Sequence, residues 1–197
     1  MADGDLFGWS GDEGLELGCA YFFALRPSAA VTDEIGQQRE LAIRALRVQR
    51  PSRVEDERLH LSLCAPKRLK RLRAPFEESL KLAGDEVTAR AFELRLQGLD
   101  LFQGGFGSPC VVLRSDGATS ASVQSLKDTI TSALFRRGFG WDASTLAPHV
   151  TLFYASDVAV PADAAGPAID WRVHEFALMK SWVGRHEHKT LKTWPLS

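Results

Sequence analysis

Two short segments, Leu59-His60-Leu61-Ser62-Leu63 and Pro148-His149-Val150-Thr151-Leu152, repeat one pattern of alternating apolar and polar residues. Alternation with period two predicts a β-strand with one buried face and one open face. In each segment the apolar residues therefore face the core, and the histidine and the hydroxyl residue share the opposite face. An imidazole that exchanges protons near neutral pH, beside a hydroxyl that can bind an anionic oxygen, is typical of a phosphate-transfer site.

A histidine followed two residues later by Ser or Thr is a weak signal by itself, since so short a motif also occurs by chance. The chain contains a third instance, His188-Lys189-Thr190, which lacks the apolar middle residue. The other two instances carry the strand alternation and occupy equivalent places in an internal duplication. The alternative interpretation is that their polar residues only cover the outer faces of two half-buried strands.

Two strand–helix–strand units of similar length contain the motifs. The expected elements are a strand at 18–25, a helix at 31–46 and the strand with His60, then a strand at 109–113, a helix at 123–134 and the strand with His149. Ser120 or Ser122 is the expected N-cap of the second helix. Cys19 precedes His60 by 41 residues, and Cys110 precedes His149 by 39. We therefore predict an α+β fold of two lobes related by a pseudo-twofold axis, each an antiparallel sheet flanked by helices, with both histidines facing a central cleft.

The rest of the chain is expected to complete these lobes. Its predicted elements are a helix at 72–83, a strand at 92–101 with a bulge at Gly98, late strands within 171–182 and at 190–194, and a loop at 155–167. Residues 1–14 are acidic and rich in glycine, and we expect them to form a flexible tail. Residues 15–197 are expected to form a single bilobal domain.

The composition bounds the class of protein. A chain of 197 residues that is 45% hydrophobic can bury an ample core. No apolar run has the length of a membrane span, and the N-terminus lacks a basic-then-apolar signal pattern. Three cysteines without paired spacing argue for a reducing compartment. We therefore expect a cytoplasmic protein, monomeric and without a membrane partner.

The charge distribution contains one local basic cluster. A net charge of −1 excludes a general nucleic-acid coat protein. The cluster follows the first motif and consists of Lys67, Arg68, Lys70, Arg71 and Arg73. It has two interpretations of equal weight, a patch that holds the phosphates of an RNA end and a solvated helix face.

Three further features have a functional and a bland interpretation. Cys64 falls on the histidine face of its strand and would line the cleft there, but we favour a small buried hydrophobe. The segment Gly104-Gly105-Phe106-Gly107 has no helix with Lys-Ser/Thr after it, so it is predicted to be a hairpin loop rather than a phosphate loop. His186 and His188 have the spacing of two metal ligands on a strand, but no third ligand is evident, and we expect neither a metal nor another cofactor.

Two histidine–apolar–Ser/Thr–Leu motifs 89 residues apart, each preceded by a strand–helix unit, resemble the 2H phosphoesterase superfamily. Within it the chain is most similar to the RNA 2′,3′-cyclic phosphodiesterases, historically called 2′-5′ RNA ligases. The resemblance runs from about Ala20 to the end and includes the opening Tyr21-Phe22-Phe23-Ala24-Leu25 and the closing Leu191-Lys192-Thr193-Trp194-Pro195-Leu196.

The chain departs from the family pattern at three places that border the cleft in relatives. Cys64-Ala65-Pro66 stands where the family often has Phe-Leu-Gly, Phe153-Tyr154 where many members place an Arg, and His188 where many have a Tyr. These departures concern the choice of substrate rather than the central chemistry.

The resemblance implies metal-independent hydrolysis of 2′,3′-cyclic phosphate at RNA or nucleotide ends to a 2′-phosphate, together with a reversible 2′-5′ ligase activity. His60 would be the acid toward O3′ and His149 the base toward water, while Ser62 and Thr151 would bind the non-bridging oxygens. The pseudo-symmetry leaves the two histidine roles exchangeable. The alternatives are a 2H phosphodiesterase acting on 2′-5′ oligoadenylate or a small cyclic nucleotide phosphate, and a non-catalytic module that binds nucleotides or RNA ends.

Overall fold

A computed structural model describes residues 15–16, 19–68, 75–103, 108–140, 146–164, 166–182 and 187–197. The predicted tail at 1–14, the glycine-rich loop at 104–107, His186 and most of the basic cluster lie outside these residues. Of the basic cluster, only the backbone of Lys67 and Arg68 is described. No helix in the described part of the chain combines the length and the apolar character that a membrane span requires.

The elements follow the predicted order of strands and helices. They are β1 Leu15–Glu16, β2 Cys19–Leu25, α1 Ala29–Ala45, β3 Ser52–Arg53, the 3-10 turn η1 Asp56–Arg58, β4 Leu61–Cys64, β5 Lys67–Arg68, α2 Phe76–Asp85, β6 Phe92–Gln103, β7 Pro109–Ser115, α3 Gly117–Arg136, β8 Phe139–Gly140, β9 His149–Tyr154, β10 Ile169–Val173, β11 Glu175–Trp182 and β12 Glu187–Pro195. The predicted loop at 155–167 contains no helix or strand among its described residues.

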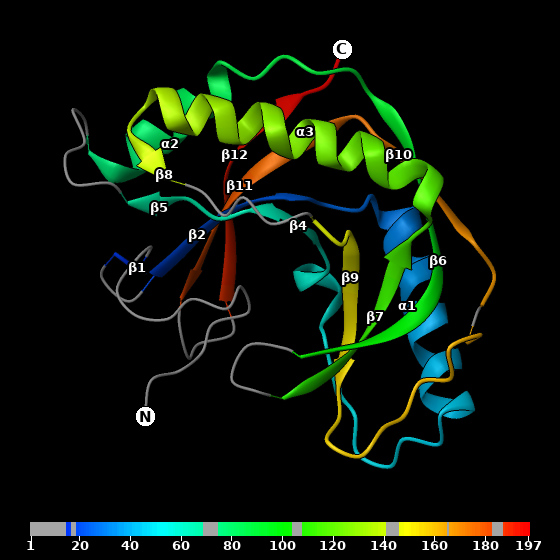
Figure 1. Cartoon of the computed structure of the whole chain (residues 1–197). Coiled ribbons are helices and arrows are strands. Elements are labelled where there is room, and N and C mark those ends of the chain that lie inside the picture. The colour runs from blue at the N-terminus through cyan, green and yellow to red at the C-terminus, as the bar shows by residue number, and fades with distance from the viewer. Residues whose placement is uncertain are drawn as a thin grey trace.

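One large antiparallel sheet contains both motif strands at its centre (Figure 1). Its order is β10-β6-β7-β9-β4-β2-β11-β12. The strands β2 and β11 flank β4 in the same way that β7 and β6 flank β9, so the two halves are related by a pseudo-twofold axis between β4 and β9. The α+β fold with two related halves is therefore confirmed, and the structure adds that both halves join into one sheet at the β4–β9 pair.

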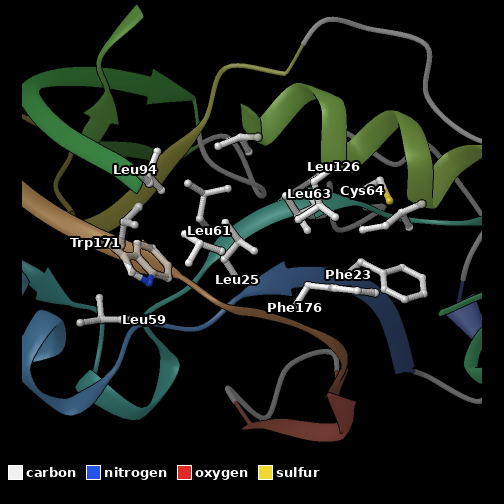
Figure 2. Packing of buried hydrophobic residues seen from close by; sticks show 14 of the residues in the cluster. Phe23, Leu25, Leu59, Leu61, Leu63, Cys64, Leu94, Leu126, Trp171 and Phe176 are labelled. Carbon is white, nitrogen blue, oxygen red and sulfur yellow. The ribbon is translucent and has the colours of Figure 1, made fainter. Parts of the chain in front are cut away.

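The core fills the space between the sheet and the three helices. Helix α1 packs on β9 and β10, α3 on β4 and β6, and α2 on β11 and β12. The three leucines of the first motif, Leu59, Leu61 and Leu63, are buried there as predicted, in the same cluster as Phe23 and Leu126 (Figure 2). A second, smaller buried cluster contains Phe22, Ala24, Ala65, Ala177 and Met179. Because Phe22 and Ala24 alternate with the core residues of β2, this smaller cluster lies on the opposite face of the sheet, the face of the motif histidines.

Two local predictions can be compared with the structure in detail, and the first needs correction. Helix α3 begins earlier than expected, because Asp116 rather than Ser120 or Ser122 is its N-cap and accepts a hydrogen bond from the Thr119 N–H at 2.7 Å. The first turn is polar and exposed or half-buried, so the apolar periodicity starts one turn after the helix does. The predicted bulge at Gly98 is confirmed, since the β6–β7 register shifts between Leu96 and Leu99 and Gly98 has a φ of +89°.

Candidate active site

The two motifs lie side by side at the centre of the sheet. Their middle residues, Leu61 and Val150, pair across β4 and β9. In an antiparallel pair this register places the histidine of each motif opposite the hydroxyl residue of the other. The resulting neighbours are His60 with Thr151 and Ser62 with His149, and all four side chains are half-buried. The two histidines are diagonal neighbours, a relation that separates Cα atoms by about 7–8 Å.

The same register extends one strand outward on both sides of the motif strands. On β7, Val112 pairs with Thr151 and Arg114 pairs with His149. On β2, Ala24 pairs with Ser62, and Leu25 pairs with Leu61, so the next residue, Arg26, lies opposite His60. On the open face, two rows of four residues therefore cross the strands β2, β4, β9 and β7 in that order. The first row is Arg26, His60, Thr151 and Val112. The second row is Ala24, Ser62, His149 and Arg114.

A β-bulge follows the hydroxyl residue in both motifs. On β4, Cys64 pairs with Phe23 while Ser62 pairs with the adjacent Ala24, which leaves Leu63 as the extra residue. The strand β9 has the same irregularity at Leu152. Each bulge reverses the alternation, so the following residue turns from the open face into the core.

Cys64 and Phe153 are the residues that the two bulges bury. Both belong to the main hydrophobic core. The expectation that Cys64 is a small buried hydrophobe is therefore confirmed, and burial raises the pKa of its thiol to about 12. Neither residue contributes to the open face, although the departures from the family pattern had drawn attention to both.

Both motif histidines are held in the same tautomer. The Nδ1 atom of His60 lies 2.7 Å from the carbonyl oxygen of Arg58, and that of His149 lies 2.7 Å from the carbonyl oxygen of Ala147. A carbonyl oxygen only accepts, so Nδ1 carries the hydrogen and donates it. Nε2 is then the nitrogen of each ring that can exchange a proton with a substrate.

Burial lowers the pKa of both histidines below the ordinary value of 6.5. The effect is larger for His60, whose pKa falls to about 4 mainly through its deeper burial, and the positive charges of Arg26 and Arg58 lower it further. Both rings are therefore neutral near pH 7 in the free protein. A phosphate anion between them would act in the opposite sense and favour a proton on one ring.

A small cavity beside His60 contains residues that the motifs do not include. It is lined by Val54, Arg58, His60, Thr151, Tyr154 and His188. Tyr154 and His188 were expected to border the cleft, and they do. Burial raises the pKa of Tyr154 to about 12, so its hydroxyl remains a hydrogen-bond donor. Arg58 was missed, because it lies in the 3-10 turn η1 before β4, where strand alternation gives no signal.

The two histidines have different aromatic neighbours. The ring of His60 packs at 5.1 Å from Phe22 and at 5.3 Å, edge to face, from His188. The ring of His149 packs at 4.6 Å from Phe102. Among the described residues there is no group of three His, Cys, Asp or Glu side chains that would hold a metal ion. Of the metal pair considered from the sequence, His188 is a neighbour of His60 and His186 lies outside the described residues.

The chain thus combines a pseudo-twofold α+β fold with two cross-strand histidine–hydroxyl pairs, and these two features define its class. The 2′-5′ RNA ligase superfamily matches residues 32–185, so the chain belongs to that superfamily. A comparison with curated proteins finds no match.

Solved structures with the same fold come from several organisms. The chain is similar to Escherichia coli LigT complexed with 3′-AMP, with 23% identity, a TM-score of 0.71, and coverage of 90% of this chain and 97% of that one. It is also similar to TT0787 of Thermus thermophilus, with 20% identity, a TM-score of 0.63, and coverage of 89% and 97%. Usb1 of Kluyveromyces marxianus is more distant, with 11% identity, a TM-score of 0.51, and coverage of 91% and 98%. At these identities the similarity establishes the fold.

Proposed function

We propose that this protein hydrolyses 2′,3′-cyclic phosphate at RNA or nucleotide ends to a 2′-phosphate, without a metal ion. The observation that carries the proposal is the cross-strand arrangement of His60, Ser62, His149 and Thr151. It brings two proton carriers and two hydroxyl donors to one central space on the sheet. Ligands of the LigT structures, which include 3′-AMP and phosphate, are of the same chemical class.

The proton balance of the reaction matches two histidines. One neutral Nε2 takes a proton from water as the water oxygen attacks phosphorus, and the P–O3′ bond breaks. The other ring, protonated at Nε2, gives its proton to the departing O3′. The products are a 2′-phosphate and a free 3′-hydroxyl, and the two rings have exchanged protonation states. Each transfer contributes about 10²–10⁴-fold to the rate.

Ser62 and Thr151 bind the non-bridging oxygens of the phosphate in this proposal. Negative charge on those oxygens grows as the fifth oxygen approaches phosphorus, and donors already in place stabilise it. Because each hydroxyl is the neighbour of the other motif's histidine, one phosphate contacts all four side chains only when it lies over the Leu61–Val150 pair. This position is also the pseudo-twofold axis.

The acid and base roles can be separated experimentally. The family resemblance assigns the acid to His60, whereas the positive charge of Arg26 and Arg58 beside His60 favours its neutral form and hence the base role. A nitrophenyl phosphodiester has a leaving group that needs no proton. Replacing the acid by Ala should therefore cost at least 10-fold less on this substrate than on a cyclic phosphate, while replacing the base should cost about the same on both.

A turnover screen tests the proposed function. The wild-type protein and a His60→Asn/His149→Asn control are incubated with 2′,3′-cyclic mononucleotides, with RNA ending in a cyclic phosphate and with 2′-5′-linked oligoadenylate. We expect turnover of the cyclic phosphates by the wild type alone, with a 2′-phosphate identified by phosphorus NMR. Turnover of only the 2′-5′ oligomer would move the protein to another substrate, and tight nucleotide binding without turnover would make it a binding module.

A further inference from the structure

The pseudo-twofold axis pairs an arginine with each motif histidine, but the two arginines differ in their partners. Arg114 lies opposite His149 and forms an ion pair with Asp100 at 3.2 Å. Its counterpart beside His60 is Arg26, which no ion pair among the described residues includes. Among the described residues, the positive charge is therefore neutralised on the His149 side of the site and not on the His60 side.

Arg58 adds a second cation on the His60 side. Its side chain lines the cavity with His60, Thr151 and Tyr154, and within the described part of the chain it also lacks an acidic partner. The Nε atoms of Arg26 and Arg58 are both buried and have no hydrogen-bond acceptor among the described residues. Buried donors without an acceptor are costly, and two guanidinium groups near one imidazole repel each other and its protonated form.

The position of these cations distinguishes them from the groups around the central phosphate. Arg26 lies one strand outside His60, about 4.8 Å further from the pseudo-twofold axis. Arg58 ends the turn η1, two residues before His60, and so lies beyond the start of β4, away from Ser62 and His149. Both arginines therefore lie on the far side of His60 from the pseudo-twofold axis. A substrate whose reacting phosphate lies at the axis would extend its neighbouring group toward them.

We infer that Arg26 and Arg58 form a binding site for a second phosphate of the substrate, the phosphate on the 5′ side of the nucleoside that carries the cyclic phosphate. This inference rests on the proposed function, because it takes the cyclic phosphate to lie at the axis. It makes the preferred substrate an oligonucleotide end rather than a mononucleotide. It also gives the substrate one direction across the pseudo-twofold axis, with the oligonucleotide leaving the site over His60.

The test compares two substrates that differ by one phosphate. Adenosine 2′,3′-cyclic phosphate carries the reacting group alone, and the same nucleotide with a 5′-phosphate carries both. We expect the wild type to prefer the second substrate in kcat/KM. Arg26→Gln and Arg58→Gln should each lower the ratio of kcat/KM on the second substrate to kcat/KM on the first by about 10–100-fold, the range for losing a hydrogen bond between charged groups.

Arg114→Gln is the matched control, because it removes the pseudo-twofold counterpart of Arg26 whose charge Asp100 already neutralises. It should leave the ratio between the two substrates within about 2-fold of the wild-type ratio. An equal loss on both substrates in Arg26→Gln and Arg58→Gln would overturn the second-phosphate site while the proposed function stood. No turnover of either substrate by the wild type would instead reject the proposed function.

A binding measurement keeps the inference testable without turnover. Calorimetric titration with adenosine 3′-phosphate and adenosine 3′,5′-bisphosphate reports the contribution of the second phosphate directly. We expect the wild type to bind the bisphosphate more tightly by about 10-fold or more, and both arginine variants to lose that difference. Equal affinity of the wild type for the two nucleotides would contradict the site.

Discussion

His60→Asn tests the electrostatics of the site through protein stability. The pKa of His60 is about 4 in the folded protein and about 6.5 in the unfolded chain. Between these values the unfolded state binds more protons than the folded state, so stability is lost as the pH falls below 6.5. Asn cannot take up the proton, but its amide can donate to the Arg58 carbonyl oxygen in place of Nδ1.

The linkage gives the size of the effect. At pH 5 the proton taken up by His60 in the unfolded chain costs the folded state about 2 kcal/mol, whereas at pH 7 it costs about 0.2 kcal/mol. The free energy of unfolding of the wild type should therefore fall by about 2 kcal/mol more than that of His60→Asn between these pH values. For a chain of 197 residues this difference corresponds to about 4–8 °C in Tm.

Urea unfolding of both proteins at pH 7 and pH 5 measures this difference. His174→Asn is the control, because His174 is exposed while its Nδ1 also faces the carbonyl oxygen two residues earlier, that of Arg172. His174→Asn should follow the wild type at both pH values. The reasoning is refuted if His60→Asn loses as much stability on acidification as the wild type does, because His60 would then titrate as it does in water.

Activity gives three further predictions. His60→Ala and His149→Ala should each lower kcat by at least about 10²-fold, and the double variant should be little worse than either, as for groups that act as a unit; full activity of one single variant would contradict the two-histidine mechanism. Ser62→Ala and Thr151→Val should lower kcat by about 10–10³-fold, whereas Ser62→Thr should be nearly silent because the second motif already has Thr at that place; a fully active Ser62→Ala would remove Ser62 from phosphate binding. The pH profile of kcat/KM should be bell-shaped with its maximum below pH 6.5, because the pKa of both histidines is lowered. A strong chelator should not change this profile. Activity that is lost to the chelator and restored by a divalent ion would require a metal.

Local patterns were sufficient to predict the elements that carry the site. The alternation around Leu61 and Val150 predicted which residues face the core, and the matched spacing of the two units predicted the pseudo-twofold relation between the two halves. These predictions succeeded because strand alternation and helix periodicity depend on near neighbours in the chain. The start of α3 failed for the same reason, since its polar first turn after Asp116 has no apolar period to reveal it.

The borders of the site depend on pairing between distant segments and could not be predicted in this way. The bulge at Leu63 exists only relative to β2, so the burial of Cys64 could not be derived from β4 alone. The positions of Arg26 and Arg114 beside the histidines likewise follow from the strand register. Arg58 could not be predicted either, because it ends the turn η1 and strand alternation does not extend to a 3-10 turn.

The duplicated fold explains how such a site can form, and its asymmetry explains how it can have a direction. A pseudo-twofold axis places equivalent groups on both sides of the reacting phosphate, so the sheet alone gives no reason for the two histidines to differ. They differ because His60 is more deeply buried, and because Asp100 neutralises Arg114 on one side while Arg26 and Arg58 have no acidic partner among the described residues on the other. Removing one of these cations should therefore reduce the difference. Arg26→Gln should raise the pKa of His60 in an NMR titration and leave that of His149 nearly unchanged. An equal rise at both histidines would mean that the charge acts over the whole site rather than on one side of the axis.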